Sequence, residues 1–452
     1  MQTRFNKLFA ITVGLLVICC LILVLMLQNQ GPHVRNSSFD NSGYRTVITL
    51  NFSAPLLPDQ QVDQYITVQP SAVFSANHTG SQITVVFQQN LSADSEYRVT
   101  VNAGLKDTRG VAGERVYVTD FNTEPARFTY LKRNYDCNKK SNSEICNDQI
   151  VERQIGSNNE VVLSEAEHIK TFDRNRDWLV VLRAENEETD VLYAVNLKTK
   201  ETVRVPIFGY EKVDKLSISP TSSVVAFTTT QLKGSFTVKL SAYMLDQARF
   251  YEIKPPGDDN GVSYFAFSND GNSLLYEDFN QSYFVTNPLT PNYTPVLLGS
   301  YSQSGSFNFN DSKIIFQKGA VQNVVYDSKT QETRSIYLSD SVTKLAFAST
   351  SNDIFAIEFI YGTTSYTTKI IKYQNESEDF YRPNNEMNID GFVSSPDDEH
   401  MLIEVSPIKT TYDTDKLYSG YSRPKNGQLV LYDTKSKKEL LVLDGINPVW
   451  TY

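Results

Sequence analysis

The chain has 452 residues, of which 40% are hydrophobic, 12% aromatic and 21% charged, and its formal net charge at pH 7 is -10. This composition excludes a disordered chain and is sufficient for two or three domains with cores of their own. The modest negative charge, without a concentrated basic stripe, argues against a nucleic-acid partner.

The first feature along the chain is an apolar run from Leu8 to Leu27, broken only by Thr12. A helix of this length reaches about 30 Å, the thickness of the hydrocarbon core of a membrane. We therefore expect an uncleaved transmembrane helix over residues 8–27. A cleaved signal peptide is the alternative, but its apolar core is shorter and ends at a small-x-small site that is missing here.

The flanks of the apolar run predict its orientation. Arg4 and Lys7 precede it without any acidic residue, so residues 1–7 are expected in the cytoplasm and the chain after residue 27 outside it. The polar segment 28–43, rich in Asn, Ser and Gly, is expected to be a flexible stalk. The sequence thus predicts a single-pass protein whose bulk is extracytoplasmic.

Outside the apolar run the chain has two cysteines, Cys137 and Cys146. In an oxidising compartment we expect them to form a disulfide that closes a small loop, with two unpaired thiols as the alternative. No second cysteine pair or neighbouring histidine completes a zinc site, and the four histidines are scattered. No metal or cofactor is therefore expected, because a metal site needs convergent ligands.

Residues 44–124 contain five short β-runs separated by turn signals, one of them at 75–81, which predicts a small β-sandwich. Tyr97, the Lys-Asp-Thr-Arg-Gly turn at 106–110 and the Phe-Asn-Thr at 121–123 stand in a recurring order. In this order the segment resembles the bacterial Ig-like domains of surface-layer and adhesin-type proteins. The resemblance implies a spacer or adhesion module in a bacterial cell envelope.

From residue 127 to 452 an apolar or aromatic residue, a short polar turn and a β-run recur about every 40 to 50 residues. Four strands per unit at this spacing predict a β-propeller. The turns Ser-Asn-Asp-Gly at 268–271 and Ser-Ser-Pro-Asp-Asp at 394–398 resemble those of WD40-like repeats in the TolB and peptidase-propeller group. The predicted fold class is all-β apart from the N-terminal helix.

The two ends of the repeat region are expected to share one sheet. Three β-runs precede Phe172, and one run, 447–452, follows the sixth full unit. Three strands plus one complete a seventh unit with the C-terminal strand innermost, and such a pairing removes the unpaired ends of an open array. We therefore predict seven blades closed by the C-terminal strand, with six or eight blades as alternatives.

An insertion in the sixth unit is the predicted binding element. About twenty residues separate two β-runs there, far more than a hairpin needs. They include Tyr412, Tyr418, Tyr421 and Arg423, residue types that are enriched at recognition surfaces. A surface loop without a binding role is the alternative.

The sequence contains no G-x-S-x-G elbow, dinucleotide fingerprint or phosphate loop, and no catalytic residue is predicted. No hydrolase domain is expected after the propeller region. We expect a non-enzymatic, membrane-anchored extracytoplasmic binding or scaffold protein whose propeller recognises a protein or a glycan. The alternatives are a hydrolase with its site in the central channel and an envelope assembly factor of the TolB type.

Overall fold

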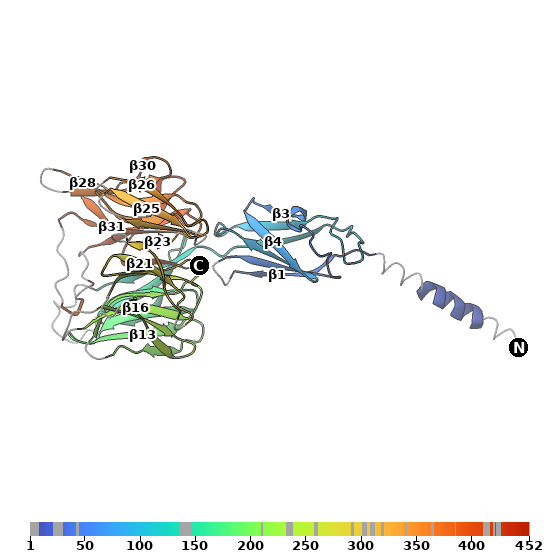
Figure 1. Ribbon diagram of the computed structural model, residues 1–452, viewed down its shortest axis with the longest axis horizontal. Helices are drawn as coiled ribbons and strands as arrows, with labels where there is room; N and C mark the ends of the chain where they lie inside the picture. The colour runs from blue at the N-terminus through green and yellow to red at the C-terminus, as the bar shows by residue number, and fades with distance from the viewer. Residues whose placement is uncertain are drawn as a thin grey trace. The chain divides into compact units, whose positions relative to one another are not determined.

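The computed structural model describes residues 9–20, 30–41 and 45–451, except for 135–146, 209–210, 232–237, 257–260, 291–292, 301–304, 308–311, 318–320, 340, 363–365, 385, 410–415, 419–420 and 422–425. The chain divides into two compact units, one ending at Glu124 and one continuing from Pro125 (Figure 1).

Residues 9–20 of the predicted anchor are helical, and residues 21–29 lie outside the described part of the chain. Among the residues that the structure describes, no helix has both the length and the apolar character needed to cross a membrane. The anchor over residues 8–27 stays a prediction.

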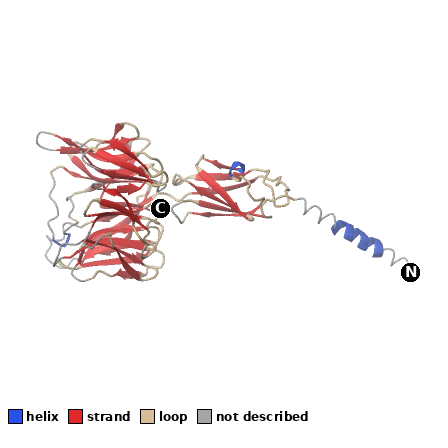
Figure 2. Ribbon diagram, in the orientation of Figure 1, coloured by secondary structure: helices blue, strands red, loops and turns tan. Residues whose placement is uncertain are grey.

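The first unit is a β-sandwich of two antiparallel sheets (Figure 2). The larger sheet contains, in order, β1 (Val34–Asp40), β2 (Val47–Phe52), β5 (Gln82–Phe87) and β4 (Phe74–Thr79). The smaller sheet contains β3 (Ile66–Gln69), β6 (Glu96–Val101) and β7 (Tyr117–Asn122), and the short 3-10 helix η1 (Asp63–Tyr65) precedes β3. Every second residue of β2 and β5 is buried, as expected for strands with one face on a core.

The sandwich differs from its prediction in two strands. β1 lies within the segment predicted as a stalk, and β4 overlaps the turn predicted at 75–81. Both strands are polar edge strands without a buried residue, so neither shows the apolar alternation that marks β2 and β5. The sandwich therefore begins about ten residues earlier than predicted.

The second unit contains, within its described residues, seven four-stranded antiparallel sheets. Six of these sheets are each built from four consecutive strands. The first contains β11 (Ile169–Arg174), β12 (Trp178–Ala184), β13 (Asp190–Asn196) and β14 (Thr202–Val205), and the second contains β15 (Glu211–Ile218), β16 (Val224–Gln231), β17 (Val238–Met244) and β18 (Arg249–Ile253). The third contains β19 (Val262–Phe267), β20 (Leu274–Asp278), β21 (Ser282–Thr286) and β22 (Val296–Ser300). The next three comprise β23 (Gly305–Phe307), β24 (Lys313–Gln317), β25 (Gln322–Asp327) and β26 (Glu332–Tyr337); β27 (Val342–Phe347), β28 (Ile354–Tyr361), β29 (Tyr366–Tyr373) and β30 (Ser377–Tyr381); and β31 (Met387–Ser394), β32 (His400–Pro407), β33 (Gln428–Asp433) and β34 (Lys438–Asp444), with the 3-10 helix η3 (Lys416–Tyr418) between β32 and β33.

The seventh sheet, which we call the terminal sheet, combines the two ends of the unit. It contains β10 (Glu160–Ala166), β9 (Asp148–Gln154), β8 (Arg127–Lys132) and β35 (Ile446–Thr451) in that order. Trp450 of β35 lies opposite Phe128 of β8, with ring centroids 5.8 Å apart, and its indole Nε1 donates to the Val393 carbonyl 3.0 Å away. The predicted pairing of the C-terminal run with the three runs before Phe172 is present.

The second strands of the sheets are buried on both faces, as in β12 and β16, where nearly every residue is inaccessible. Their apolar side chains join cores that include residues of two neighbouring sheets, such as the cluster around Val180 and Phe227. This explains why these runs are continuously apolar in sequence, because a strand covered on both sides shows no alternation.

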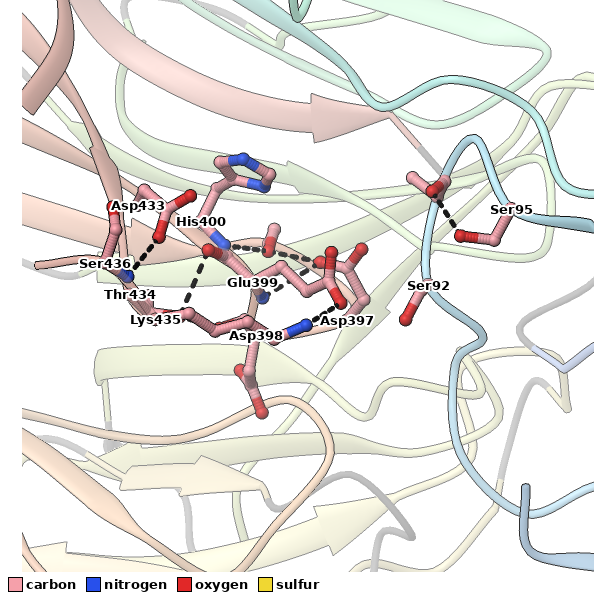
Figure 3. A network of polar contacts seen from close by, with 12 residues as sticks. Ser92, Ser95, Asp397, Asp398, Glu399, His400, Asp433, Thr434, Lys435 and Ser436 are labelled. Atoms are coloured by element: carbon pink, nitrogen blue, oxygen red, sulfur yellow. Dashed lines mark hydrogen bonds and ion pairs between the residues drawn. The ribbon is translucent and has the colours of Figure 1, made fainter. Parts of the chain in front are cut away.

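The polar turns between first and second strands form the same hydrogen bonds in two sheets. Asp397 Oδ1 accepts from Ser395 Oγ at 2.6 Å and from the Glu399 backbone N–H at 3.1 Å (Figure 3). Asp270 Oδ1 accepts the equivalent bonds from Ser268 Oγ and the Asn272 N–H, at 2.7 and 2.9 Å. These aspartates stabilise tight turns, which is the role that the repeat pattern indicates for them.

Asp398, in the same turn, connects two sheets. Its carboxylate accepts from the backbone N–H groups of Ser349 and Thr350, each at 2.7 Å, and from the Thr350 hydroxyl, also at 2.7 Å. Burial raises the pKa of Asp398, and these three donors act against that rise. Asp398 is therefore part of the packing between the two sheets.

Candidate functional site

Five first strands of the second unit contain a β-bulge near their start. The register shifts by one residue in β11, β15, β19, β27 and β31. The residues that directly follow the bulge occupy equivalent positions and are Thr171, Lys215, Tyr264, Lys344 and Gly391. A bulge bends its strand and redirects the following side chain, so these five positions share one environment.

The two lysines at these positions make the same contact. Lys215 Nζ donates to the Phe265 carbonyl at 2.7 Å, and Lys344 Nζ donates to the Phe392 carbonyl at 3.2 Å. Each acceptor lies on the first strand of the following sheet, one residue after the position that aligns with the lysine itself. The Lys215 ammonium also lies 3.9 Å from the centre of the Tyr264 ring, a cation–π contact.

The charges at these positions affect one another. Burial, and after it the positive charge of Lys344, lowers the pKa of Lys215 to about 8, and Asp173 on β11 opposes this shift. Burial likewise raises the pKa of Asp173, although Ser217 Oγ and the Ile218 N–H donate to its Oδ2 at 2.7 and 2.9 Å. Lys215 and Lys344 belong to β15 and β27, between which two other first strands intervene in the chain.

Gly391 makes room for a carboxylate beside Lys344. A Cβ at this position would lie 2.9 Å from Glu404 Oε2 and 3.5 Å from Lys344 Nζ. The absence of a side chain therefore lets Glu404 of β32 reach the neighbourhood of the lysine. The other carboxylate oxygen of Glu404 accepts from the backbone N–H of Asn447, whose Nδ2 donates to Thr171 Oγ1 at 3.2 Å.

We call these groups the inner-strand polar cluster. Its members are Asp173, Lys215, Tyr264, Lys344, Glu404 and Asn447. They come from six sheets, and both lysines are only partly exposed. Nowhere in the described residues do three or more His, Cys, Asp or Glu side chains gather closely enough to hold a metal ion. The cluster combines cations, a phenol and two carboxylates, a set suited to binding a polar group.

The cluster was not predicted, although the repeats carry a signal for it. When the units are aligned on their first strands, Lys215, Tyr264 and Lys344 fall in one column, with an apolar residue two positions before each and another directly after it. A polar side chain recurring between buried apolar neighbours marks a position that faces neither sheet core.

Of the predicted binding residues, Tyr418 is described and is buried, with 6% of its surface exposed. Its hydroxyl donates to Asp148 Oδ2 at 2.8 Å, and the Arg133 guanidinium lies 4.1 Å from the ring centroid. Burial raises the pKa of Asp148, and hydrogen bonds from the Asn134 N–H and Tyr418 oppose the rise. Arg133 and Asp148 belong to the terminal sheet or its connections, so the insertion crosses from its own sheet to another.

Tyr421 also contacts residues outside its own sheet. Its carbonyl accepts from Arg133 Nη1 at 3.1 Å, its ring centroid lies 5.7 Å from Lys170 Nζ, and it packs against the core shared by the sheets of β11 and β15. Lys170 forms a buried ion pair with Asp190 at 2.8 Å. Tyr412 and Arg423 lie outside the described residues, as do Cys137 and Cys146, so the predicted disulfide stays a prediction.

A second group of aromatic residues lies at the end of the β28–β29 hairpin. Phe359 is 6.2 Å from Tyr361 and 5.0 Å from Tyr366 between ring centroids, and the two tyrosines lie directly opposite each other. Tyr361 is 74% exposed and Tyr366 44% exposed. We call these three residues the hairpin surface. Figures 1 and 2 show the end of β28 and η3 at the same side of the second unit.

Residues 32–123 match the family of bacterial Ig-like domains. The first unit is therefore a bacterial Ig-like domain, which confirms the resemblance seen in the sequence. The match begins at residue 32 and so includes β1, in agreement with the structure. A comparison with curated proteins finds none that matches the chain.

The second unit has the sheet organisation of a β-propeller, and solved structures of low identity are similar to the chain. They include the β-propeller domain of Cps50 (Swd1) from Myceliophteria thermophila, 12% identical with a TM-score of 0.43 over 62% of this chain and 87% of that one. A protein from Lactobacillus plantarum is 12% identical with a TM-score of 0.45, over 72% and 99%. The dihydro-heme d1 dehydrogenase NirN is 13% identical with a TM-score of 0.44, over 79% and 72%.

Proposed function

We propose that the chain is a membrane-anchored, extracytoplasmic binding protein of a bacterial cell envelope, in which the second unit recognises a protein partner through the hairpin surface. The observation that carries the proposal is the exposure of Tyr361 and Tyr366 beside Phe359. Tyrosine and arginine are enriched where proteins bind one another, and clustered exposed rings are costly to leave in water.

The opposite face of the same hairpin carries charged side chains. Lys369 forms ion pairs with Glu358 and Asp379 at 2.9 and 2.5 Å, and Arg382 lies 3.1 Å from Asp379. A glycan partner is the competing outcome, and the experiment below separates the two.

The test is site-specific photo-crosslinking in native membranes. A photoreactive residue replaces Tyr361 in the full chain, and a matched chain carries it at Tyr337, which is 67% exposed on the outer strand β26. We expect a protein adduct from position 361 that position 337 does not give, and its loss in a chain that also carries Tyr366→Ala. Equal adducts from both positions, or binding to glycans alone, would contradict a protein partner at this surface.

We further infer that the seven sheets form a closed, seven-bladed ring. The inference is supported by contacts between neighbouring sheets. β35 of the terminal sheet contacts β11, and the first strands of the next sheets contact one another in the order β11, β15, β19, β23 and β27. On its other side β35 contacts β31, the first strand of the last sheet. Removal of residues 446–452 should then destabilise the whole second unit, since β35 completes the terminal sheet. Thermal unfolding equal to that of a chain lacking only residue 452 would exclude a closing role.

The anchor is part of the same proposal. It is supported by the apolar run up to Leu27 and by the positive residues Arg4 and Lys7 before it. We expect the full chain to remain with membranes after alkaline extraction. A soluble mature protein that begins near Gln28 would exclude the anchor and indicate a cleaved signal peptide.

A further inference from the structure

The ammonium group of Lys215 has no ion-pair partner among the described residues, although the charge of Asp173 acts on it from a greater distance. This ammonium group donates to the Phe265 carbonyl and lies over the Tyr264 ring, but no carboxylate in the described part of the chain forms an ion pair with it. An ammonium group has three N–H donors, and one carbonyl uses one of them. A partly buried charge of this kind is costly unless an anion accompanies it.

Charges of both signs act on Lys215, the positive one of Lys344 and the negative one of Asp173, and that of Lys344 has the larger effect. Lys344 is close enough for its charge to act on Lys215, and the carboxylate of Asp173 is already held by Ser217 Oγ and two backbone N–H groups. Glu404 lies beside Lys344 rather than beside Lys215. Lys215 is therefore the lysine of the cluster without a carboxylate in ion-pair contact among the described residues, and Lys344, whose charge acts on it, belongs to a different sheet.

We propose that the inner-strand polar cluster binds the oxyanion of a small solute, a carboxylate or a phosphate, through the ammonium group of Lys215, with Lys344 adding positive potential. Both lysines retain partial exposure, so a small ion reaches them, while their backbone acceptors keep the ammonium groups in place. Charge-assisted hydrogen bonds in a confined site are stronger than those in open water. This site is separate from the hairpin surface and does not depend on it.

A purely structural role makes a different prediction. If Lys215 and Lys344 only connect neighbouring sheets through the carbonyls of Phe265 and Phe392, anions will neither bind nor protect them. If the proposal is correct, an anion will cover the Lys215 amine and leave an exposed lysine unaffected. Lys329, exposed in the turn after β25, is the matched reference.

The first experiment uses the wild-type full chain in detergent. Its amines are acetylated in short pulses at about pH 8, and modification of Lys215 and Lys329 is mapped by mass spectrometry. Inorganic phosphate, acetate and chloride are compared at equal ionic strength, so that general screening is constant. We expect phosphate or acetate to slow Lys215 acetylation about tenfold at saturation, with Lys329 unchanged. The more protective anion identifies which of the two chemistries the site takes.

The second experiment uses variants. Calorimetric titration with the protective anion is repeated on Lys215→Met, Lys344→Met and Lys329→Met in the full chain. We expect affinity to fall about tenfold or more in the first, less in the second and not at all in the third. Equal protection by chloride, no protection by either oxyanion, or unchanged affinity of Lys215→Met would each overturn the proposal. The labelling result holds even if Lys215→Met fails to fold.

Discussion

Two tyrosine-rich connections of the second unit, the insertion after β32 and the β28–β29 hairpin end, each join the second and third strands of a sheet, yet they place their rings in opposite environments. Tyr418 of the insertion is buried between Arg133 and Asp148, which belong to another sheet or its connection, whereas Tyr361 of the hairpin stacks near Phe359 of its own strand and is 74% exposed. Tyrosine suits both places because it has an apolar ring and a polar end. The neighbouring residues, rather than the residue type, decide whether such a connection packs against another sheet or is exposed to solvent.

The largest expected effect tests the buried side of this comparison. Tyr418→Ala removes the ring beneath Arg133 and the donor to Asp148, and we expect it to lower the free energy of unfolding by about 3–5 kcal/mol. Chemical denaturation of the full chain, followed for the second unit, measures this loss. A cost within experimental error would show that the insertion is not anchored through this residue.

Arg133 offers a second test, expected to be smaller. Its guanidinium donates to the carbonyls of Tyr421, Ile169 and Lys170, a fork that an ammonium group does not reproduce. Arg133→Lys should lower the free energy of unfolding of the second unit by about 1–3 kcal/mol. Arg382→Lys, at the exposed hairpin side, is the control and should change stability by less than about 0.5 kcal/mol. Similar effects of the two changes would remove the distinction between the regions.

Tyr418→Phe isolates the hydroxyl and gives a pH-dependent result. Burial raises the pKa of Asp148, while the hydroxyl of Tyr418, the Asn134 N–H and the charge of Arg133 favour its ionised form. Without the hydroxyl the ionised carboxylate loses one donor, so the pKa of Asp148 rises further. The variant should then cost about 1–2 kcal/mol near pH 7, and the cost should shrink as acid protonates Asp148 in both proteins. A cost that is constant with pH would contradict this coupling.

The smallest expected effect tests the exposed side. Tyr361→Ala should change the free energy of unfolding by less than about 0.5 kcal/mol, because the ring is mostly in solvent. The same change should lower the affinity for the proposed partner about tenfold or more if Tyr361 lies at the centre of the interface. A large loss of stability would mean that the hairpin surface packs against the molecule and is not available to a partner.

Most of the fold was predictable because its signals are local. The alternation in β2 and the apolar run of β12 follow from one covered face and two covered faces, and the pairing of β35 with β8 followed from counting strands. The polar edge strands β1 and β4 were missed since their stability depends on a neighbouring strand and not on their own pattern.

The candidate sites were harder to predict. The insertion was chosen for its tyrosines and its length, which indicate a functional loop but do not reveal that Tyr418 meets Asp148, 270 residues earlier in the chain. The hairpin surface has no distinguishing motif, because the sequence does not show whether a tyrosine or phenylalanine in a strand is exposed or buried. The lysines of the inner-strand polar cluster were overlooked because single polar residues within a strand are common.

The sequence alone determined the β-sandwich and the four-stranded repeats, since each depends on periodicity that the backbone imposes within a few residues. The bacterial Ig-like character followed from a resemblance, and the pairing of the last strand from counting strands. Only the tertiary structure decided that Lys215 and Lys344 act on one another, that Gly391 admits Glu404 beside Lys344, and that Tyr418 is buried while Tyr361 is exposed. The physical reason is that bulges and sheet packing set which distant side chains meet, and these depend on the whole arrangement of strands.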